Sequence, residues 1–367
     1  MNLGIECGNN GVIYADMMGG YGSSRSNFVY VHGKKEEEGR TKDDFKNSFK
    51  IDWDDRFDEE ILETVGDMCF LTVGLVKGED GKTVYKKFLS QYDAIKYIKE
   101  NLEEDTIVNV KGNLEWSDYN EATQYKKTIT SIVLSKAEEK DFRATFTQTI
   151  LIDSDTIGSY DKETNTIPLM TRIVESISKE YRGQSLIHTD NGKQVKSAML
   201  PLFKTFDFAV GEDKEKAKKM LKVFKVKGKK LTAMTVEGMF SKGEVETTEV
   251  TEVDIPDDIK ELIELGYVDK DEIVGQIALK NGGGNKKQEK MIITKPHIKY
   301  NKVGESMIPA VDKTSDLYEE SDVDIKEILK SFGIEEIVED NNEDDDLDLA
   351  LSSEDDDDDD WLKELDN

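Results

Sequence analysis

Two short segments of the chain bring basic and aromatic residues together. They read VYKKFLSQY at 84–92 and WSDYNEATQYKK at 116–127. Ammonium groups neutralise phosphates, and flat rings stack on unpaired bases at about 1 to 3 kcal/mol each. The two segments therefore indicate contacts with a single-stranded nucleic acid. The residues predicted to make these contacts are Tyr85, Lys86, Lys87, Tyr92, Lys111, Trp116, Tyr119, Tyr125, Lys126 and Lys127.

Trp116 has two interpretations on sequence alone. It keeps the parity of Val110 and Leu114 in an alternating pattern, which favours burial in a core as strongly as a stacking role. Tyr119 stands in a polar stretch without apolar neighbours, so it is the better stacking candidate.

The second half of the chain repeats this chemistry in weaker form. The segment LPLFKTFDFAV (200–210) mixes rings with a lysine, although its phenylalanines are more typical of a core, and basic clusters follow at 213–230 and 285–302. The predicted nucleic-acid contacts here are Lys204, Lys229, Lys230, Lys286 and Lys287.

The last residues form an acidic tail with an apolar tip. From Glu335 onward 18 acidic residues face Lys363 alone, which gives 1 − 18 = −17 of the net charge of −29. A solvated charge run is the ordinary interpretation. However, apolar residues that are costly to leave in water follow the aspartate run. A long polyanion on a flexible tether can compete with DNA for the protein's own cationic groove, and the apolar residues offer an anchor to partner proteins. The predicted partner-binding residues are Trp361, Leu362 and Leu365.

Signatures of enzymes and of cofactor sites are absent from the sequence. The segment GEDGKT lacks the first glycine of a phosphate-binding loop, since Val76 stands at that position. His32, His188 and His297 are scattered without cysteine partners, so no metal site is predicted. We therefore expect a protein that is not an enzyme and that needs no cofactor.

The hydrophobic pattern predicts a mainly β chain with inserted helices. A hairpin at 69–90 is followed by a helix at 90–102 and by strands at 106–116 and 125–135. The succession recurs as a helix at 213–224 and strands at 231–240 and 244–254, and a further strand is predicted at 291–299.

The repeated strands indicate an internal duplication. Gly112 and Gly238 stand in the middle of the matching strands with an offset of 238 − 112 = 126 residues. A glycine inside a strand typically permits a bulge, and a helix followed by such a strand is the layout of the OB-fold, a five-stranded Greek-key barrel that binds oligonucleotides.

We therefore expect two tandem OB-fold barrels and a disordered tail. The predicted divisions are a Gly-rich, charged N-terminal arm with one strand at NFVYVH (1–44), a first OB-fold (45–140), a second OB-fold with a helical insertion and a basic loop (141–310), a linker with a short amphipathic helix (311–334) and the acidic tail (335–367).

Cysteine content and hydropathy favour the cytoplasm. The chain has 2 cysteines, too few for a disulfide framework, and its longest apolar run is far shorter than the ~20 residues that span a bilayer. No membrane partner is predicted.

The segment 84–134 resembles the distal half of the OB-fold of bacterial and phage single-stranded DNA-binding proteins. It has a strand, a helix, a V-x-V-x-G-x-L strand, a tip with Trp or Tyr and a final strand, and the acidic tail is similar to theirs as well. The resemblance implies sequence-tolerant binding of single-stranded DNA in replication, recombination or repair, and recruitment of replication or recombination proteins through the tail. Proteins of this family usually carry one short domain and assemble as tetramers, whereas this chain duplicates the barrel, so we expect a monomer or small homo-oligomer. The double-barrel, acidic-tailed organisation favours a phage protein acting in the bacterial cytoplasm.

Two alternatives remain open at this stage. One is an OB-fold interaction scaffold whose net charge of −29 mimics DNA without binding nucleic acid. The other is a nuclease on a modified OB-fold, for which the sequence offers no catalytic constellation.

Overall fold

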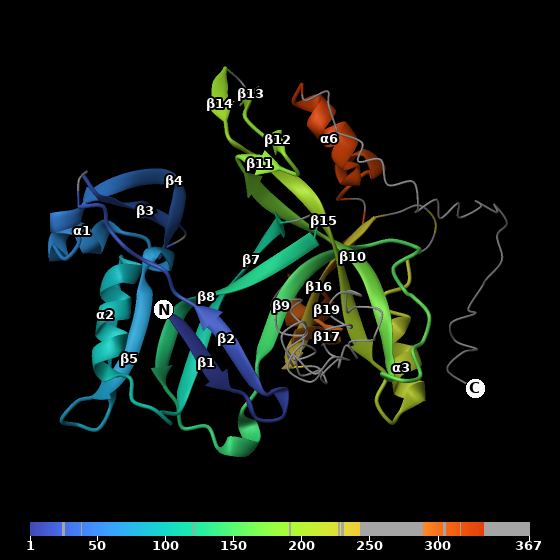
Figure 1. The fold of residues 1–367 in the computed structure, drawn as a ribbon, viewed down its shortest axis with the longest axis horizontal. Helices are drawn as coiled ribbons and strands as arrows, with labels where there is room; N and C mark the ends of the chain where they lie inside the picture. The colour runs from blue at the N-terminus through green and yellow to red at the C-terminus, as the bar shows by residue number, and fades with distance from the viewer. Residues whose placement is uncertain are drawn as a thin grey trace, which may run out of the picture. The chain divides into compact units, whose positions relative to one another are not determined.

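The structure is a computed structural model, and it describes residues 1–23, 26–37, 39–119, 122–190, 192–226, 228, 231–242, 289–303, 306–315 and 317–333. The chain divides into two compact units. The first comprises Met1–Gly8 and Val12–Phe142, and the second comprises Asn9–Gly11 and the chain from Arg143 onward. Both units are mainly β, as predicted (Figure 1).

The first unit is built on a six-stranded sheet. Its pairing order is β1-β2-β8-β5-β6, with β7 antiparallel to β8, while β3 and β4 form a separate hairpin. Its elements are β1 (Asn2–Glu6), β2 (Val12–Asp16), β3 (Phe28–Glu37), β4 (Arg40–Asp52), α1 (Glu59–Thr64), β5 (Leu71–Lys77), β6 (Thr83–Phe88), α2 (Gln91–Asn101), β7 (Val108–Tyr119) and β8 (Ala122–Leu134).

Helix α2 forms where the sequence predicts a helix. The hydroxyl of Ser90 accepts a hydrogen bond from the backbone N–H of Tyr92 and caps the first turn. Ala94 and Ile98 are buried, and they belong to the same core cluster as Val73 of β5. Figure 1 shows the helix alongside this strand. One face of the sheet is thus covered, and the side chains of alternate parity lie on the opposite face.

The second unit contains a closed five-stranded barrel. Its ring of pairings runs β9-β10-β15-β17-β16 and returns to β9, with β15 and β17 parallel and the other pairs antiparallel. Helix α3 lies between the third and fourth barrel strands in the chain, as in the predicted OB-fold layout. The elements are β9 (Thr145–Ile152), β10 (Thr166–Ser178), β11 (Glu180–Tyr181), β12 (Gln184–Ser185), β13 (His188–Asp190), β14 (Lys193–Val195), β15 (Ser197–Ala209), α3 (Lys214–Leu221), β16 (Thr232–Lys242), β17 (Glu289–Pro296), β18 (Ile298–Val303), β19 (Ser306–Val311), β20 (Lys313–Ser315) and α6 (Ile325–Ser331).

The two mid-strand glycines both lie at a β-bulge, as the sequence predicts. The register of β7 with β8 shifts at Lys111/Gly112, and that of β16 with β17 shifts at Glu237/Gly238. A Cβ atom on Gly112 would lie 2.0 Å from the carbonyl oxygen of Thr128, and one on Gly238 would lie 2.4 Å from the carbonyl oxygen of Ile292. Both positions therefore exclude any side chain.

Gly238→Ala is expected to destabilise the protein by about 1 to 3 kcal/mol, because the added methyl group must push back a backbone oxygen and the ring of Phe146. Urea unfolding measures the loss. Gly20→Ala is the matched control, since a Cβ there meets nothing within 4 Å. Equal midpoints for Gly238→Ala and Gly20→Ala would refute the packing argument.

Two expectations about the domain divisions need revision. Residues 1–44 are not a loose arm, because they supply β1, β2, β3 and the start of β4, with Ile13 and Met17 buried; the strand expected at NFVYVH is confirmed as part of β3. Residues 311–334 are not only a linker, because β20 pairs with β16 and Leu329 of α6 is buried.

The barrel is closed by a strand other than the one predicted. The strand expected at 244–254 lies outside the described residues, and β17, within the further strand predicted at 291–299, completes the ring. In the described part of the first unit the strand pairings do not form a closed ring. Among the described helices, none has both the length and the apolar character that crossing a membrane requires.

Candidate nucleic-acid interface

The face of the first sheet opposite α2 carries a lateral row with a lysine at each end. Lys87 of β6 pairs with Thr72 of β5, Thr72 pairs with Ser131 of β8, and Ser131 pairs with Lys111 of β7. Four neighbouring strands span about 14 Å between the outer two. The two lysines therefore flank a floor of small hydroxyl side chains.

Tyr85 lies on the same face, next to this row. Its side chain is 62% exposed, and a Cβ on Gly74 of β5 would lie 3.1 Å from its ring. The ring thus rests over a glycine and leaves its other side to solvent. Because Gly74 offers no side chain, the phenol can lie flat on the sheet, which suits stacking on a base.

Parity places two more predicted residues on this side of β7 and β8. Tyr119, at the end of β7, has the same strand parity as Lys111 and is 63% exposed. Lys126 of β8 pairs with Glu115, which also has the parity of Lys111, so Lys126 lies on the same face. The face that carries Tyr85, Lys87, Lys111, Tyr119 and Lys126 is called the open face below.

The other predicted residues of these strands point away from the open face. Lys86 places its Nζ 4.5 Å from the ring centre of Tyr97 in α2, and Lys127 lies 5.0 Å from that of Tyr125. Trp116 is a correction to the predicted site: it is only 5% exposed and packs at 5.2 Å on Tyr125. The core interpretation of Trp116 is the right one, as its strand parity allowed.

A cluster of three rings forms where the chain enters α2. Tyr21 lies 5.4 Å from Trp53 and 5.1 Å from Tyr92 between ring centres, and Trp53 lies 6.1 Å from Tyr92. Tyr21 is 53% exposed and Tyr92 is 36% exposed. We call Tyr21, Trp53 and Tyr92 the aromatic cluster; only Tyr92 was predicted from the sequence.

Arg56 joins this cluster to a carboxylate. Its guanidinium lies 4.0 Å from the ring centre of Trp53 and donates hydrogen bonds from Nε and Nη2 to Asp93 at 2.7 and 3.2 Å. The ion pair is largely buried, with side-chain exposures of 15% and 11%. Arg56 therefore holds Trp53 against α2 as a preorganised platform.

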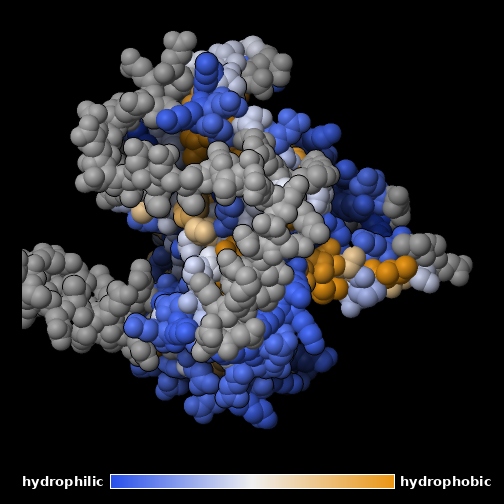
Figure 2. Space-filling model, turned by 90° about the vertical axis from the view of Figure 1, so that its right-hand side faces the viewer, coloured by the Kyte–Doolittle hydropathy of each residue, from blue (hydrophilic) through white to orange (hydrophobic). Residues whose placement is uncertain are grey.

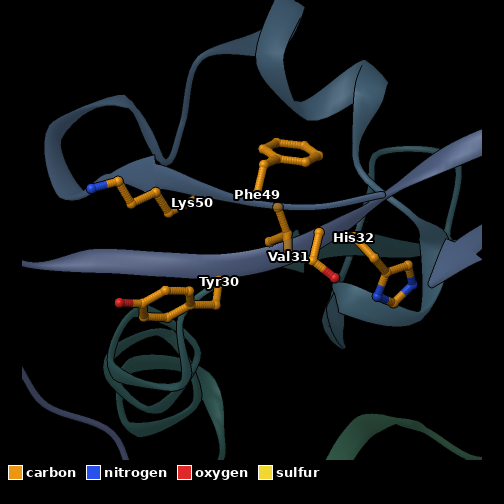
Figure 3. Close-up of a pocket in the computed structure, with 6 residues that line it drawn as sticks. Tyr30, Val31, His32, Phe49 and Lys50 are labelled. Atoms are coloured by element: carbon orange, nitrogen blue, oxygen red, sulfur yellow. The ribbon is translucent and has the colours of Figure 1, made fainter. Parts of the chain in front are cut away.

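A further ring and lysine pair lies on the β3–β4 hairpin. Tyr30 is 79% exposed and is paired with Lys50, whose Nζ lies 4.1 Å from the ring centre of Phe28. An open hollow of about 440 Å³ is lined by Tyr30, Val31, His32, Ser48, Phe49 and Lys50. Figure 3 shows Tyr30 and Lys50 extending toward the same side of the hairpin.

Lys87 is partly neutralised by a neighbour. Its Nζ lies 3.2 Å from Asp67 Oδ1, and Lys34 lies 3.6 Å from the same oxygen. The hydrogen bond from Lys87 lowers the pKa of Asp67, so the carboxylate is charged at neutral pH. A phosphate on the open face must displace Asp67 from Lys87, which is a small cost for an exposed pair.

The remaining predicted residues are not gathered into this interface. Lys204 belongs to the second unit, is half-buried on β15, and burial lowers its pKa. Lys229, Lys230, Lys286 and Lys287 lie outside the described residues, as do Trp361, Leu362 and Leu365.

The exposed rings are concentrated in the first unit. In the described part of the second unit, the exposed aromatic side chains are Phe203 and Tyr300. On the face of the molecule in Figure 2 the atoms that are not grey are mostly hydrophilic, and the apolar ones gather mainly in one group to the right of the centre. The exposed rings of the first unit are Tyr14, Tyr21, Tyr30, Phe45, Phe57, Tyr85, Tyr92 and Tyr119.

Comparison of the chain with protein-family models, with curated proteins and with solved structures found no match.

Proposed function

We propose that the protein binds single-stranded DNA without strong sequence preference and acts in replication or recombination without being an enzyme. The observation that carries the proposal is the open face, where Lys87 and Lys111 flank a floor of small side chains beside the exposed ring of Tyr85. Lysines that follow a backbone and rings that accept any base are what sequence-tolerant binding requires.

The aromatic cluster extends the same chemistry. Tyr21 and Tyr92 present exposed edges and faces, and Arg56 fixes Trp53 beside them. A ring held in place loses little conformational entropy when a base stacks on it. In this proposal the open face and the aromatic cluster together form the binding surface of the first unit.

We propose further that the first unit is a divergent OB-fold related to the second by duplication. In each unit a helix precedes a strand with a glycine at its bulge, and the next strand pairs antiparallel with it. That last strand also runs parallel to an earlier strand, β5 in the first unit and β15 in the second. The acidic tail is proposed to compete for the binding surface and to recruit partner proteins.

Titration with labelled dT oligomers at low and moderate salt tests the proposal. We expect tight binding that weakens steeply as salt rises, similar binding of other unstructured DNA sequences, and weak binding of duplex DNA. An interaction scaffold that mimics DNA would leave the oligomers unbound at every salt concentration. Metal-dependent cleavage of the labelled strands would instead support a nuclease.

Tryptophan fluorescence locates the contact. The chain has 3 tryptophans, of which Trp53 is half-buried in the aromatic cluster and Trp116 is buried. We expect dT oligomers to quench the fluorescence of the wild type and of Trp116→Phe, and to leave Trp53→Phe nearly unquenched. Trp361→Phe controls for the tail. Full quenching in Trp53→Phe would remove the aromatic cluster from the binding surface.

A further inference from the structure

The carboxylate of Asp67 joins two lysines that come from different sheets of the first unit. Its Oδ1 accepts a hydrogen bond from Nζ of Lys87 at 3.2 Å, and Nζ of Lys34 lies 3.6 Å from the same oxygen. Lys87 belongs to β6 of the six-stranded sheet, whereas Lys34 belongs to the β3–β4 hairpin. We call Lys34 and Lys87 the lysine pair. Two ammonium groups that reach one oxygen atom form a site for an anionic oxygen.

The backbone fixes Asp67 beside Lys34. Val65, two residues before Asp67, is fully buried and forms an isolated β-bridge with Gly33 of β3. Gly33 immediately precedes Lys34 in the chain. The connection between the hairpin and β5 therefore brings the carboxylate to the same part of the hairpin as the ammonium group of Lys34.

Strand pairing and an aromatic ring hold Lys87 close to the same oxygen. Lys87 pairs with Thr72 of β5, and its Nζ lies 5.2 Å from the ring centre of Phe70, two residues before Thr72. Phe70 packs against the core cluster that contains Val65. The ring and the strand pairing position the ammonium group independently of Asp67, so it stays near this point when another anion replaces the carboxylate.

The carboxylate is the most exposed of the three groups. The side chain of Asp67 is 65% exposed, that of Lys87 is 55% exposed and that of Lys34 is 26% exposed. Asp67 can therefore turn into solvent at little cost. Lys34 is partly withdrawn from water, and an ion pair gains strength as its surroundings become less polar. An anion that takes the place of Asp67 meets one exposed and one largely covered ammonium group.

We propose that the lysine pair is a phosphate-binding site for single-stranded DNA, and that Asp67 occupies this site when DNA is absent. The proposal rests on the proposed function and adds Lys34, which was not predicted from the sequence. A non-bridging phosphate oxygen replaces Asp67 Oδ1 between the two ammonium groups, and the carboxylate turns into solvent. Because Lys34 lies on the β3–β4 hairpin, the DNA strand is bound by the hairpin as well as by the sheet, and Asp67 limits the affinity.

Glu37 supplies a matched control within the same unit. Its Oε2 lies 3.2 Å from Nζ of Lys42 and 3.5 Å from Nζ of Lys35, so it also joins two lysines through one oxygen. All three residues belong to the β3–β4 hairpin, and Glu37 is the last residue of β3. Glu37→Gln and Asp67→Asn each remove one negative charge and release two lysines. A comparison of the two variants therefore cancels the general effect of charge.

The test measures fluorescence polarisation of a labelled dT oligomer titrated with the full chain at several salt concentrations. At low salt we expect Asp67→Asn to bind about threefold more tightly than the wild type or better, and Glu37→Gln to stay within about 1.5-fold. Lys34→Gln should weaken binding about threefold or more and reduce the slope of log K against log salt by about 0.7, as the loss of one phosphate contact requires. Lys35→Gln, which changes the neighbouring lysine, should leave that slope unchanged.

Two results would overturn the phosphate site while leaving the proposed function in place. One is a wild type that binds DNA while Asp67→Asn and Glu37→Gln change the affinity equally. The other is the same salt slope for Lys34→Gln and Lys35→Gln. If Lys34→Gln proves unfolded in a thermal melt, the exposed Asp67 and Glu37 still decide the question. A wild type that binds no dT oligomer at any salt concentration would refute the proposed function and this site together.

Discussion

Replacing Tyr21, Trp53 and Tyr92 together with alanine is expected to weaken binding of a dT oligomer at least about 30-fold. If two bases stack on the aromatic cluster at about 1 to 3 kcal/mol each, about 2 kcal/mol or more is lost, and every 1.4 kcal/mol is a factor of ten. The salt dependence of binding should stay unchanged, because no cation is removed. Fluorescence polarisation of a labelled oligomer measures both quantities.

The controls separate stacking from folding. The three rings pack on one another at 5.1 to 6.1 Å, so their joint removal also costs stability, and thermal unfolding must show that the variant is folded at the assay temperature. Tyr85→Ala/Tyr119→Ala removes two rings of the open face that are 62% and 63% exposed, with little effect on stability. It should weaken binding about tenfold or more.

A matched pair of exposed rings lies in the second unit. Phe203→Ala/Tyr300→Ala removes side chains that are 56% and 63% exposed, and its affinity should stay within about twofold of the wild type. Equal losses in the two units would show that the first unit is not the preferred binding surface. No loss in any variant would leave the aromatic residues without a role in binding.

Local patterns account for the parts of the fold that were predicted. Helix α2 follows from the Ser90 cap and a buried stripe that begins at Ala94, and these contacts are a few residues apart. The bulge at Gly112 was predictable because a mid-strand glycine has few other uses. The open face was also predictable, since strand parity alone places Lys111 opposite the core residue Val110.

Contacts between distant segments account for what was missed. Trp53 and Arg56 lie in the acidic stretch IDWDDRFDEE, where a surface turn is the natural interpretation. Their part in the aromatic cluster becomes clear only in the structure, where Arg56 pairs with Asp93. The two residues lie 93 − 56 = 37 positions apart in the chain. The expectation that the histidines lack cysteine partners is wrong for the same reason, because His32 meets Cys69 across an equal separation of 37 residues.

The strands of the first 44 residues were hidden by composition. Glycines surround β2, so the alternation of Ile13, Ala15 and Met17 is too short to stand out, yet all three are buried. The backbone N–H of Met17 also bonds to the carbonyl of Met1, which ties the segment down at its start. Tertiary burial thus outweighs a local sequence that favours loops.

Removing the acidic tail is expected to tighten DNA binding about tenfold at low salt. A chain that ends at Ile334 lacks 18 acidic residues and Lys363, which together carry a net charge of 1 − 18 = −17. Trp361 lies 361 − 333 = 28 residues beyond Gly333, so the tip can reach at most about 100 Å from Gly333. In this proposal the carboxylates of the tail compete with DNA phosphates for the lysines of the open face.

Salt distinguishes this competition from other effects of truncation. The attraction of the tail for the open face weakens as the screening length falls from about 30 Å at 0.01 M to about 10 Å at 0.1 M salt. The affinities of the full chain and of the truncated chain should therefore converge as salt rises. The variant Trp361→Ala/Leu362→Ala/Leu365→Ala keeps the charge and removes the apolar tip, and it should bind DNA like the full chain while losing capture of partner proteins. Identical affinities of the full and truncated chains at low salt would mean that the tail does not occupy the binding surface. The tail would then act only in the recruitment of partner proteins.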